Sequence, residues 1–154
     1  DGGGNVTPVG EYNVSADPEP ATAVCDPAGA KTLIGWNISR TYAVMTPPET
    51  ERLRSCGRLG RFAVDINAEV EKFCRANGLE GMDFPDPVAM AVALDDSIVT
   101  EATEERLVVG LDEPTRGATL PDRRINSEPP NIRVVWRVDE AAFKDRLYTA
   151  CSDS

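Results

Sequence analysis

The strongest constraint on the fold is the way strand and helix patterns alternate along the chain. NIRVVWRV alternates apolar and polar residues as a strand does. The following DEAAFKDRLYTAC predicts an amphipathic helix capped by Asp139, whose inner face carries Ala142, Phe143, Leu147 and Ala150. Strand and helix patterns alternate over most of the length, which predicts an α/β fold.

The earlier segments follow the same alternation. A helix capped by Ser15 or Asp17 is expected to end near Pro27 and Gly29. The next elements are a strand in KTLIGWNIS, a helix with Thr46 as its cap and Gly57 as its stop, and a long helix over 59–76. They are followed by a short helix with Asp86 at or near its N-cap, and by strands in EERLVVGLD and TRGATLPD.

The expected core comes mainly from the long helix. Its apolar residues fall on one helical face and are expected to pack inward: Leu59, Phe62, Ala63, Ile66, Val70, Phe73 and Cys74. Trp36 and Trp136 are both expected in strands, within the core.

Length and charge exclude several classes of function. The 154 residues suit one domain, and no apolar run reaches the roughly 20 residues of a membrane helix. The net charge of −10, without a basic stripe, argues against nucleic-acid binding. We therefore expect neither nucleic acid nor membrane as a partner.

Cysteine spacing and the lack of histidine limit the chemistry. Cys25, Cys56, Cys74 and Cys151 form no C-x-x-C pair, and the chain has no histidine, which excludes a Cys/His zinc site. Four reduced thiols in a cytoplasmic protein are expected, with two disulfides as the alternative. Ser-His and Cys-His nucleophiles are excluded, so chemistry would need carboxylates, a metal or a partner chain.

Two polar clusters are candidates for a site. Asn5, Glu11 and Asn13 follow a glycine-rich start and suit a polyhydroxylated ligand, although turn formation explains them equally well. Asp83 and Asp86, with Asp95 and Asp96, could bind a hard cation such as calcium, although N-capping by Asp86 is the simpler interpretation. Arg116 could bind an anion or pair with a neighbouring acid.

Five segments in order resemble the inosine-uridine preferring nucleoside hydrolases. They are GGGNVTPVGEYNVSADPEPA, MTPPETERLR, FPDPVAMAVALDDS, TRGATLPDRR and NIRVVWRVDEAAFKDRL. The family has N-x-T-P and E-[FY]-N in the first segment and T-R-G-x-T-x-x-D-x-R in the fourth. The resemblance covers essentially the whole chain.

The resemblance implies a fold, a reaction and roles for individual residues. It implies an open mixed or parallel sheet with flanking helices, and calcium-dependent hydrolysis of the N-ribosidic bond of ribonucleosides. By position, Asn5 and Glu11 would hold the 5′ side of the ribose, Asn13 would bind a ring hydroxyl, and Asp86 would be a calcium ligand. The partner is a small-molecule nucleoside, and a homo-oligomer is expected.

Two departures from the family pattern qualify this expectation. The D-x-D-x-x-x-D-D motif of the family's first strand does not occur, so residues 1–154 resemble a single carboxy-terminal half-domain without catalytic residues. Such a half needs a complementary amino-terminal half or a second copy to cover its sheet. The second departure is Pro85, at the position of a family histidine. Proline cannot donate a proton, so another residue, solvent or a better leaving group would be required.

The departures leave two alternatives to an enzyme half. One is a catalytically inactive ribose- or nucleoside-binding module, and the other is a fragment without independent function.

Overall fold

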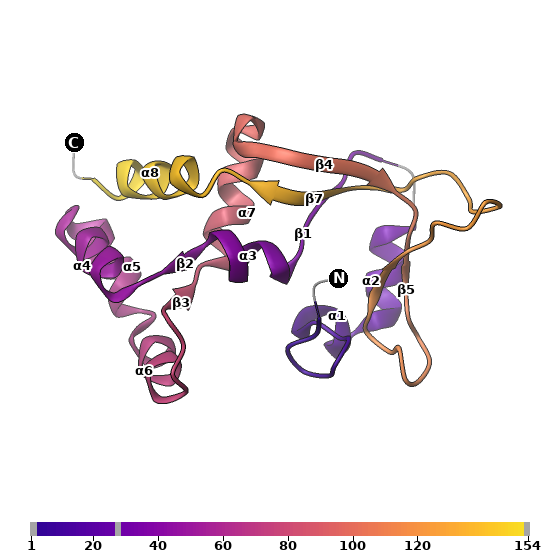
Figure 1. Ribbon diagram of the computed structural model, residues 1–154, viewed down its shortest axis with the longest axis horizontal. Coiled ribbons are helices and arrows are strands. Elements are labelled where there is room, and N and C mark those ends of the chain that lie inside the picture. The colour runs from indigo at the N-terminus through magenta and orange to yellow at the C-terminus, as the bar shows by residue number, and fades with distance from the viewer. Residues whose placement is uncertain (1–2, 27–28, 153–154) are drawn as a thin grey trace. The chain divides into compact units, whose positions relative to one another are not determined.

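A three-stranded sheet in the order β1–β7–β4 is the longest-range strand pairing in the computed structural model, which describes residues 3–26 and 29–152 (Figure 1). The strands are β1 (Thr32–Ile34), β2 (Val44–Met45), β3 (Met82–Asp83), β4 (Val99–Glu105), β5 (Leu107–Val109), β6 (Thr119–Pro121) and β7 (Ile132–Val138). The helices are α1 (Tyr12–Ala16), α2 (Pro18–Cys25), α3 (Trp36–Tyr42), α4 (Pro47–Ser55), α5 (Arg58–Asp65), α6 (Ala68–Ala76), α7 (Pro85–Leu94), the 3₁₀ turn η1 (Asp96–Ile98) and α8 (Glu140–Cys151).

Strand pairing is both parallel and antiparallel. β1 runs parallel to β7, with Leu33 opposite Val134, whereas β2–β3 and β5–β6 are antiparallel pairs. A parallel pair requires a long connection between its strands, and helices supply much of it. The predicted α/β class, with an open mixed or parallel sheet and flanking helices, is confirmed.

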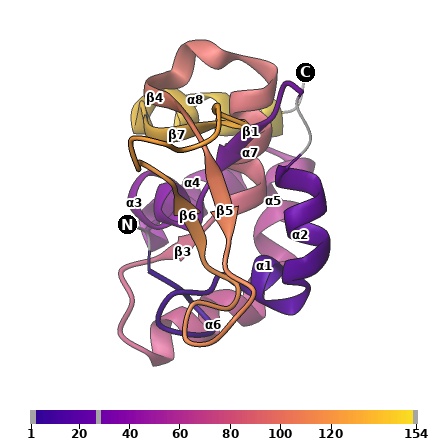
Figure 2. The ribbon, with the colours of Figure 1, turned by 90° about the vertical axis from the view of Figure 1, so that its right-hand side faces the viewer.

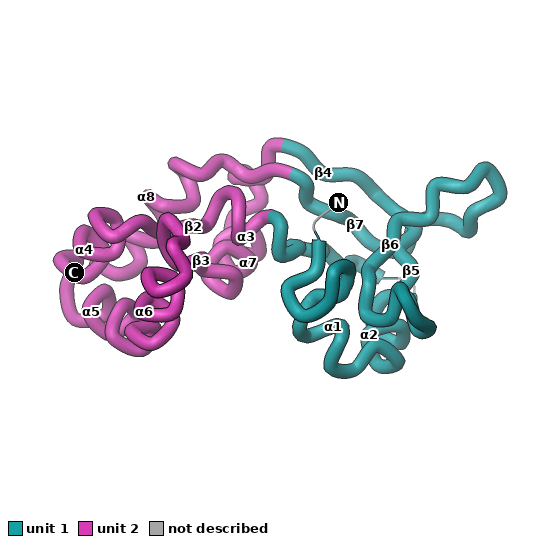
Figure 3. The backbone as a smooth tube through the Cα atoms, turned by 60° about the horizontal axis from the view of Figure 1, so that its bottom comes forward, with its two compact units in different colours: residues 1–37, 101–136 teal, residues 38–100, 137–154 magenta. Residues whose placement is uncertain are grey.

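The chain divides into two compact units, coloured separately in Figure 3. Unit 1 contains residues 1–37 and 101–136, and unit 2 contains residues 38–100 and 137–154. The expectation of a single half-domain over residues 1–154 stays a prediction.

Unit 1 is built around a small apolar cluster of Leu107, Ile132 and Val134. The buried Asn131 amide closes one end of this cluster: its Oδ1 accepts from Leu107 N at 2.8 Å and its Nδ2 donates to Leu107 O at 3.0 Å. The side chain thus satisfies both backbone groups of Leu107, as a neighbouring strand would. α2 packs against β5 in the same unit (Figure 2).

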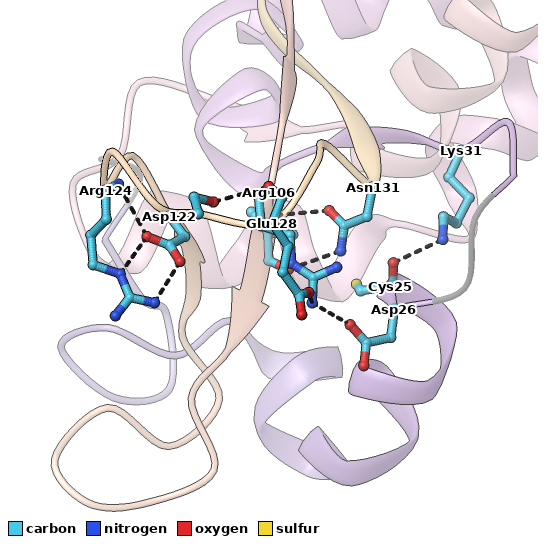
Figure 4. Close-up of polar contacts among 10 residues, drawn as sticks. Cys25, Asp26, Lys31, Arg106, Asp122, Arg124, Glu128 and Asn131 are labelled. Carbon is cyan, nitrogen blue, oxygen red and sulfur yellow. Dashed lines mark hydrogen bonds and ion pairs between the residues drawn. The ribbon is translucent and has the colours of Figure 1, made fainter.

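Ion pairs reinforce the edge of this cluster. Arg106 bridges Asp26, at the end of α2, and Glu128, at 2.7 and 2.6 Å (Figure 4). Lys31 Nζ donates to Cys25 O at 2.8 Å. The Arg106 contact joins the end of α2 to the start of β5, and the Lys31 contact joins it to the start of β1.

Unit 2 has the larger core, built from α3, α4, α7, α8 and the β2–β3 pair. Its most deeply buried side chains are Ile38, Met45, Leu53, Val64, Met82, Val88, Ile98 and Phe143. The predicted caps at Thr46 and Asp139 are confirmed, whereas Asp17 is the N-cap residue of α2 without a side-chain cap hydrogen bond. Thr46 and Glu49 form a capping box on α4, and the Asp139 side chain accepts from Ala142 N on α8.

The inner face of α8 is only partly as predicted. Phe143 is buried and Ala142 and Leu147 are half-buried, but Ala150 is exposed and the unpredicted Tyr148 is buried.

The single long helix predicted over 59–76 is wrong. It is two helices, α5 and α6, separated at Ile66 and Asn67. Asn67 is the N-cap residue of α6, and its side-chain amide donates to Ala63 O at 2.8 Å. A side chain that bonds to the preceding turn competes with the helix at this point.

The prediction that the apolar stripe of this segment packs inward is also mostly wrong. Cys74 is buried and Ala63 is half-buried, but five large side chains are exposed: Leu59, Phe62, Ile66, Val70 and Phe73. α5 instead buries Gly60 and Val64. A Cβ at Gly60 would lie 2.0 Å from Leu53 O, so the backbones of α4 and α5 approach closely at this glycine. Phe62 follows Gly60 by two residues on α5, so its side chain lies on the opposite face of the helix, away from α4.

The strand expected in KTLIGWNIS is shorter than predicted. β1 ends at Ile34, and Trp36 is the first residue of α3, so the placement of Trp36 in a strand is wrong. Trp136 does lie in a strand, β7, where it is half-buried and its Nε1 donates to Thr103 Oγ1 at 2.6 Å.

α2 ends at Cys25, and Pro27 lies outside the described residues. All four cysteines are free thiols. Across the described part of the chain, no helix combines the length and apolar character that crossing a membrane requires.

We predict that Asn131→Ala destabilises the protein by about 2 kcal/mol, because it leaves both backbone groups of Leu107 buried without partners. Urea unfolding followed by circular dichroism measures the change. Asn77→Ala is the control, since it removes only an exposed bond to Phe73 O, and it should cost much less. Equal losses for both variants would contradict the role assigned to Asn131.

Candidate functional site

The three predicted ligand-binding residues of the opening segment lie together in unit 1. Glu11 is the N-cap of α1, and its Oε2 accepts from Asn13 N at 2.9 Å and from Val14 N at 3.2 Å. Asn5 Oδ1 accepts from Tyr12 N at 2.8 Å. Asn13 Nδ2 lies 3.4 Å from Glu11 Oε1. The segment expected as a loop therefore contains a short helix, which the three side chains surround at its start.

Glycines make this tight arrangement sterically feasible. A Cβ at Gly10 would lie 2.2 Å from Ser15 Oγ and 2.8 Å from Thr7 Oγ1, and one at Gly4 would lie 2.0 Å from Thr7 O. Thr7 Oγ1 accepts from Gly10 N at 2.8 Å and closes the turn. These contacts explain the glycines at positions 4 and 10; Gly2 lies outside the described residues.

The loop between β5 and β6 supports the opening segment. Gly117 has φ of +79°, and a Cβ there would lie 2.4 Å from Ser15 Oγ. The Ser15 hydroxyl is buried without a hydrogen-bond partner among the residues that the structure describes. The two segments therefore touch through Gly117 and Ser15, where any larger side chain at Gly117 would separate them.

Arg116, in the same loop, pairs with an acid. Its guanidinium makes two bonds to the Glu19 carboxylate, at 2.9 and 3.0 Å. This hydrogen bonding lowers the pKa of Glu19. Of the two roles expected for Arg116, pairing with a neighbouring acid is the one observed.

The atoms that form the turn leave other atoms of the same side chains available. The Asn5 amide nitrogen and the Asn13 amide oxygen have no hydrogen-bond partner within the described ranges, and both residues are exposed. Glu11 accepts two strong bonds through Oε2 and only a long one through Oε1. A carboxylate oxygen can accept more than one bond. The segment therefore presents one donor and two acceptors to a ligand rich in hydroxyl groups.

The aspartates of the second cluster lie in unit 2 and have separate roles. Asp83, in β3, accepts from Ser39 Oγ and Arg40 Nη1, both at 3.3 Å. Asp95 accepts from Ser97 N at 2.9 Å and pairs with Arg146. The hydrogen bond from Arg146 holds the pKa of Asp95 at about 2. Asp83 and Asp95 are therefore already paired with arginines.

Asp86 is an exposed acid of this cluster, as is Asp96. It is the second residue of α7, whose N-cap is Phe84, so Asp86 lies near the cap but does not occupy it. Its carboxylate lies in the first turn, where the helix dipole favours negative charge. Among the residues that the structure describes, the Asp86 carboxylate has no hydrogen-bond or ion-pair partner.

The described residues do not assemble a calcium site by themselves. Calcium takes six to eight oxygen ligands, and within residues 3–26 and 29–152 no group of three Asp, Glu, Cys or His residues could hold a metal. Asp86 offers one ligand, so the other oxygens of such a site would have to come from elsewhere.

Sequence reasoning found the three polar residues of unit 1 but missed how they are held. The cap role of Glu11 could have been predicted from an acid directly before Y-N-V-S, because an N-cap acceptor precedes the first helical turn. Nothing in the local sequence indicates that Gly117 contacts Ser15, because the two residues come from distant segments.

Comparison with known proteins gives one consistent family. The sequence profile of the family described as inosine-uridine preferring nucleoside hydrolase matches residues 1–145. The chain is 30% identical over 146 residues to the inosine-uridine preferring nucleoside hydrolase of Crithidia fasciculata, covering 91% of this chain and 45% of that protein. It is 30% identical over 154 residues to a pyrimidine-specific ribonucleoside hydrolase of Klebsiella pneumoniae, covering 94% and 47%.

Solved structures give the same result. A purine-preferring ribonucleoside hydrolase from Gardnerella vaginalis superposes with a TM-score of 0.84 at 30% identity, covering 97% of this chain and 48% of that one. An inosine-guanosine nucleoside hydrolase superposes with a TM-score of 0.82 at 25% identity, covering 94% and 47%. The chain thus spans about half the length of the relatives it matches.

We predict that Glu11→Ala increases hydrogen exchange at the Asn13 and Val14 amides about fivefold, because loss of an N-cap costs about 1 kcal/mol. Glu11→Gln keeps an oxygen that can accept from both amides, and should leave their exchange close to wild type. Exchange monitored by nuclear magnetic resonance separates the two variants. Unchanged exchange in Glu11→Ala would mean that the carboxylate does not hold the start of α1.

Proposed function

Because the chain belongs to the inosine-uridine preferring nucleoside hydrolase family, we propose that it is the ribose-binding part of an enzyme that hydrolyses the N-ribosidic bond of ribonucleosides. The products are ribose and the free base. The observation that carries this proposal is the grouping of Asn5, Glu11 and Asn13 around the start of α1, with a donor and two acceptors still available.

The proposed roles follow from the chemistry of these atoms. On the 5′ side of the ribose, the Asn5 amide nitrogen donates a hydrogen bond and Glu11 Oε1 accepts one. The Asn13 amide oxygen accepts from a ring hydroxyl. Such bonds fix the sugar, so that part of the cost of ordering it is met before the reaction. A carboxylate near the ring also favours the positive charge of an oxocarbenium-like transition state.

We place no catalytic residue in this chain. The chain has no histidine, and Pro85 precedes Asp86 where the family motif has one. Protonation of the leaving base therefore falls to solvent, to a residue outside this chain, or is avoided by a better leaving group. The chain by itself is expected to be inactive.

Calcium is the proposed cofactor, with Asp86 as one of its ligands. A bound calcium ion would orient the ribose diol and activate a water molecule. Support comes from the exposed Asp86 carboxylate, which is unpaired within the described residues while Asp83 and Asp95 are paired with arginines. The remaining ligands are proposed to come from outside the described residues.

A complementary amino-terminal half, or a second copy of the chain, is the proposed macromolecular partner. Five large apolar side chains of the segment 59–73 in unit 2 are exposed, and exposed apolar surface of this kind favours association. A homo-oligomer remains the expected assembly. The cytoplasmic location also stays a prediction.

A non-catalytic ribose- or nucleoside-binding module is the second candidate. It is favoured by the lack of histidine and by the absence, among the described residues, of three acids that could hold a metal. It shares the ribose contacts of the first candidate but predicts binding without release of the base.

We predict that Glu11→Gln and Asn13→Ala each weaken ribose binding by the complete protein about tenfold, because a hydrogen bond to a charged or well-positioned group contributes about 1–2 kcal/mol. Calorimetric titration with ribose measures binding, and release of ribose from inosine and uridine measures activity. Asn77→Ala, an exposed asparagine of unit 2, is the matched control. Binding without ribose release would favour the module, whereas unchanged binding in both variants would contradict the site.

We predict that Asp86→Asn weakens calcium binding by the complete protein at least tenfold, because an amide supplies a neutral ligand in place of a charged one. Titration calorimetry with calcium measures the affinity, and ribose release with and without a chelator measures its effect. Asp145→Asn, an acid on α8, is the control for net charge. Calcium affinity that does not change in Asp86→Asn would exclude Asp86 as a ligand.

A further inference from the structure

Two helices of unit 2, α4 and α8, contact each other at matching intervals. Lys144 Nζ donates to Glu49 Oε1 at 2.7 Å. One turn further along both helices, the Arg52 guanidinium lies over the Tyr148 ring, 3.9 Å from its centre. Residue numbers increase on both helices from the first contact to the second, so α4 and α8 run parallel along this contact.

The next step along both helices brings two cysteines to the same level. Cys56 follows Arg52 by four residues and Cys151 follows Tyr148 by three, and both spacings keep a side chain on the same helical face. The Cys56 thiol contacts Arg52 O at 3.4 Å, so it lies against the last turn of α4. α8 also packs against α5, which begins directly after Gly57.

The electrostatics of unit 2 agree with this placement. Burial raises the pKa of the Cys151 thiol, and the neighbouring Cys56 raises it further. Burial also raises the pKa of Tyr148, to which Cys56 contributes as well. Cys56 is therefore close to both Tyr148 and Cys151 on α8. Both cysteines are half-buried, which leaves them accessible to a small oxidant.

We propose that Cys56 and Cys151 form a reversible disulfide on exposure to a peroxide, linking the end of α4 to the end of α8. Of the other cysteines, Cys25 belongs to unit 1, and Cys74 is buried on α6.

The chemistry balances with hydrogen peroxide as the oxidant. One thiol loses its proton, and the thiolate attacks a peroxide oxygen. The O–O bond breaks, and the departing hydroxide takes up the released proton, so that a sulfenic acid and one water form. The second thiolate attacks the sulfenic sulfur, the S–O bond breaks, and a second water leaves as the S–S bond forms. The two sulfurs supply the two electrons that reduce the peroxide. A dithiol reductant reverses the reaction by thiol–disulfide exchange.

The bond would stabilise unit 2. It joins residues far apart in the sequence, and a crosslink that closes a long loop restricts the unfolded chain most. The oxidised protein is therefore expected to unfold at a higher temperature than the reduced protein, and a reductant should remove the difference.

The test is to oxidise the purified protein with hydrogen peroxide, alkylate the remaining thiols and map tryptic peptides by mass spectrometry. The expected product is SCGR, residues 55–58, linked to LYTACSDS, residues 147–154. Formation of the disulfide removes two of the four thiols in this chain, so two reactive thiols should remain. Monomer and covalent dimer bands are separated on a non-reducing gel before digestion, so that only bonds within one chain are counted.

Two variants provide the controls. Cys25→Ser/Cys74→Ser keeps both proposed partners and should give the same linked peptide, whereas Cys56→Ser should lose both the peptide and the thermal shift. Circular dichroism establishes that each variant is folded. Separate oxidation of Cys56 and Cys151 in the folded double variant would overturn the proposal, as would a linked peptide found only in covalent dimers.

Discussion

The arrangement of the candidate ribose site depends on the reversal of the backbone at Gly10. The space beside its α-carbon is filled by Ser15 Oγ and Thr7 Oγ1, so no side chain fits there. The reversal puts Glu11 directly at the start of α1, where its carboxylate meets two amide groups. A bulkier residue at Gly10 would move this carboxylate, and Asn5 and Asn13 would lose the geometry that groups them.

The two polar clusters illustrate the difference between an acid that stabilises the fold and one that is available to a ligand. Asp83 and Asp95 each have an arginine partner. Asp86 is exposed at the start of α7, where the dipole of the helix favours its charge. Proximity in sequence groups these aspartates, but arginine partners distinguish Asp83 and Asp95 from Asp86, which is proposed as a calcium ligand. The same distinction applies within Glu11, one of whose oxygens holds the helix while the other has only a long contact.

Matching intervals on two parallel helices produce a different kind of order in unit 2. The same helical period that pairs Glu49 with Lys144 and Arg52 with Tyr148 brings Cys56 and Cys151 to one level. Burial alone would raise the pKa of Glu49. Hydrogen bonds from Lys144 and Thr46 outweigh this effect, so the pKa of Glu49 is lowered. Glu49 therefore serves both as part of the capping box of α4 and as the partner of α8. The register of α8 thus depends on a residue whose local role is to start another helix.

The sequence by itself determined the features that depend on neighbouring residues: the caps at Thr46 and Asp139, the alternating strand β7, the α/β class and the family. Its polar opening segment also gave the three residues of the candidate site. Only the tertiary structure decided which faces are buried. Periodicity predicts that Phe62 and Phe73 share an apolar face, but not that contact between α4 and α5 at Gly60 leaves Phe62 exposed. Likewise, Trp36 has an apolar side chain suited to a strand, yet it begins α3. A local sequence pattern indicates which side chains are apolar, whereas packing between distant segments decides which of them are buried.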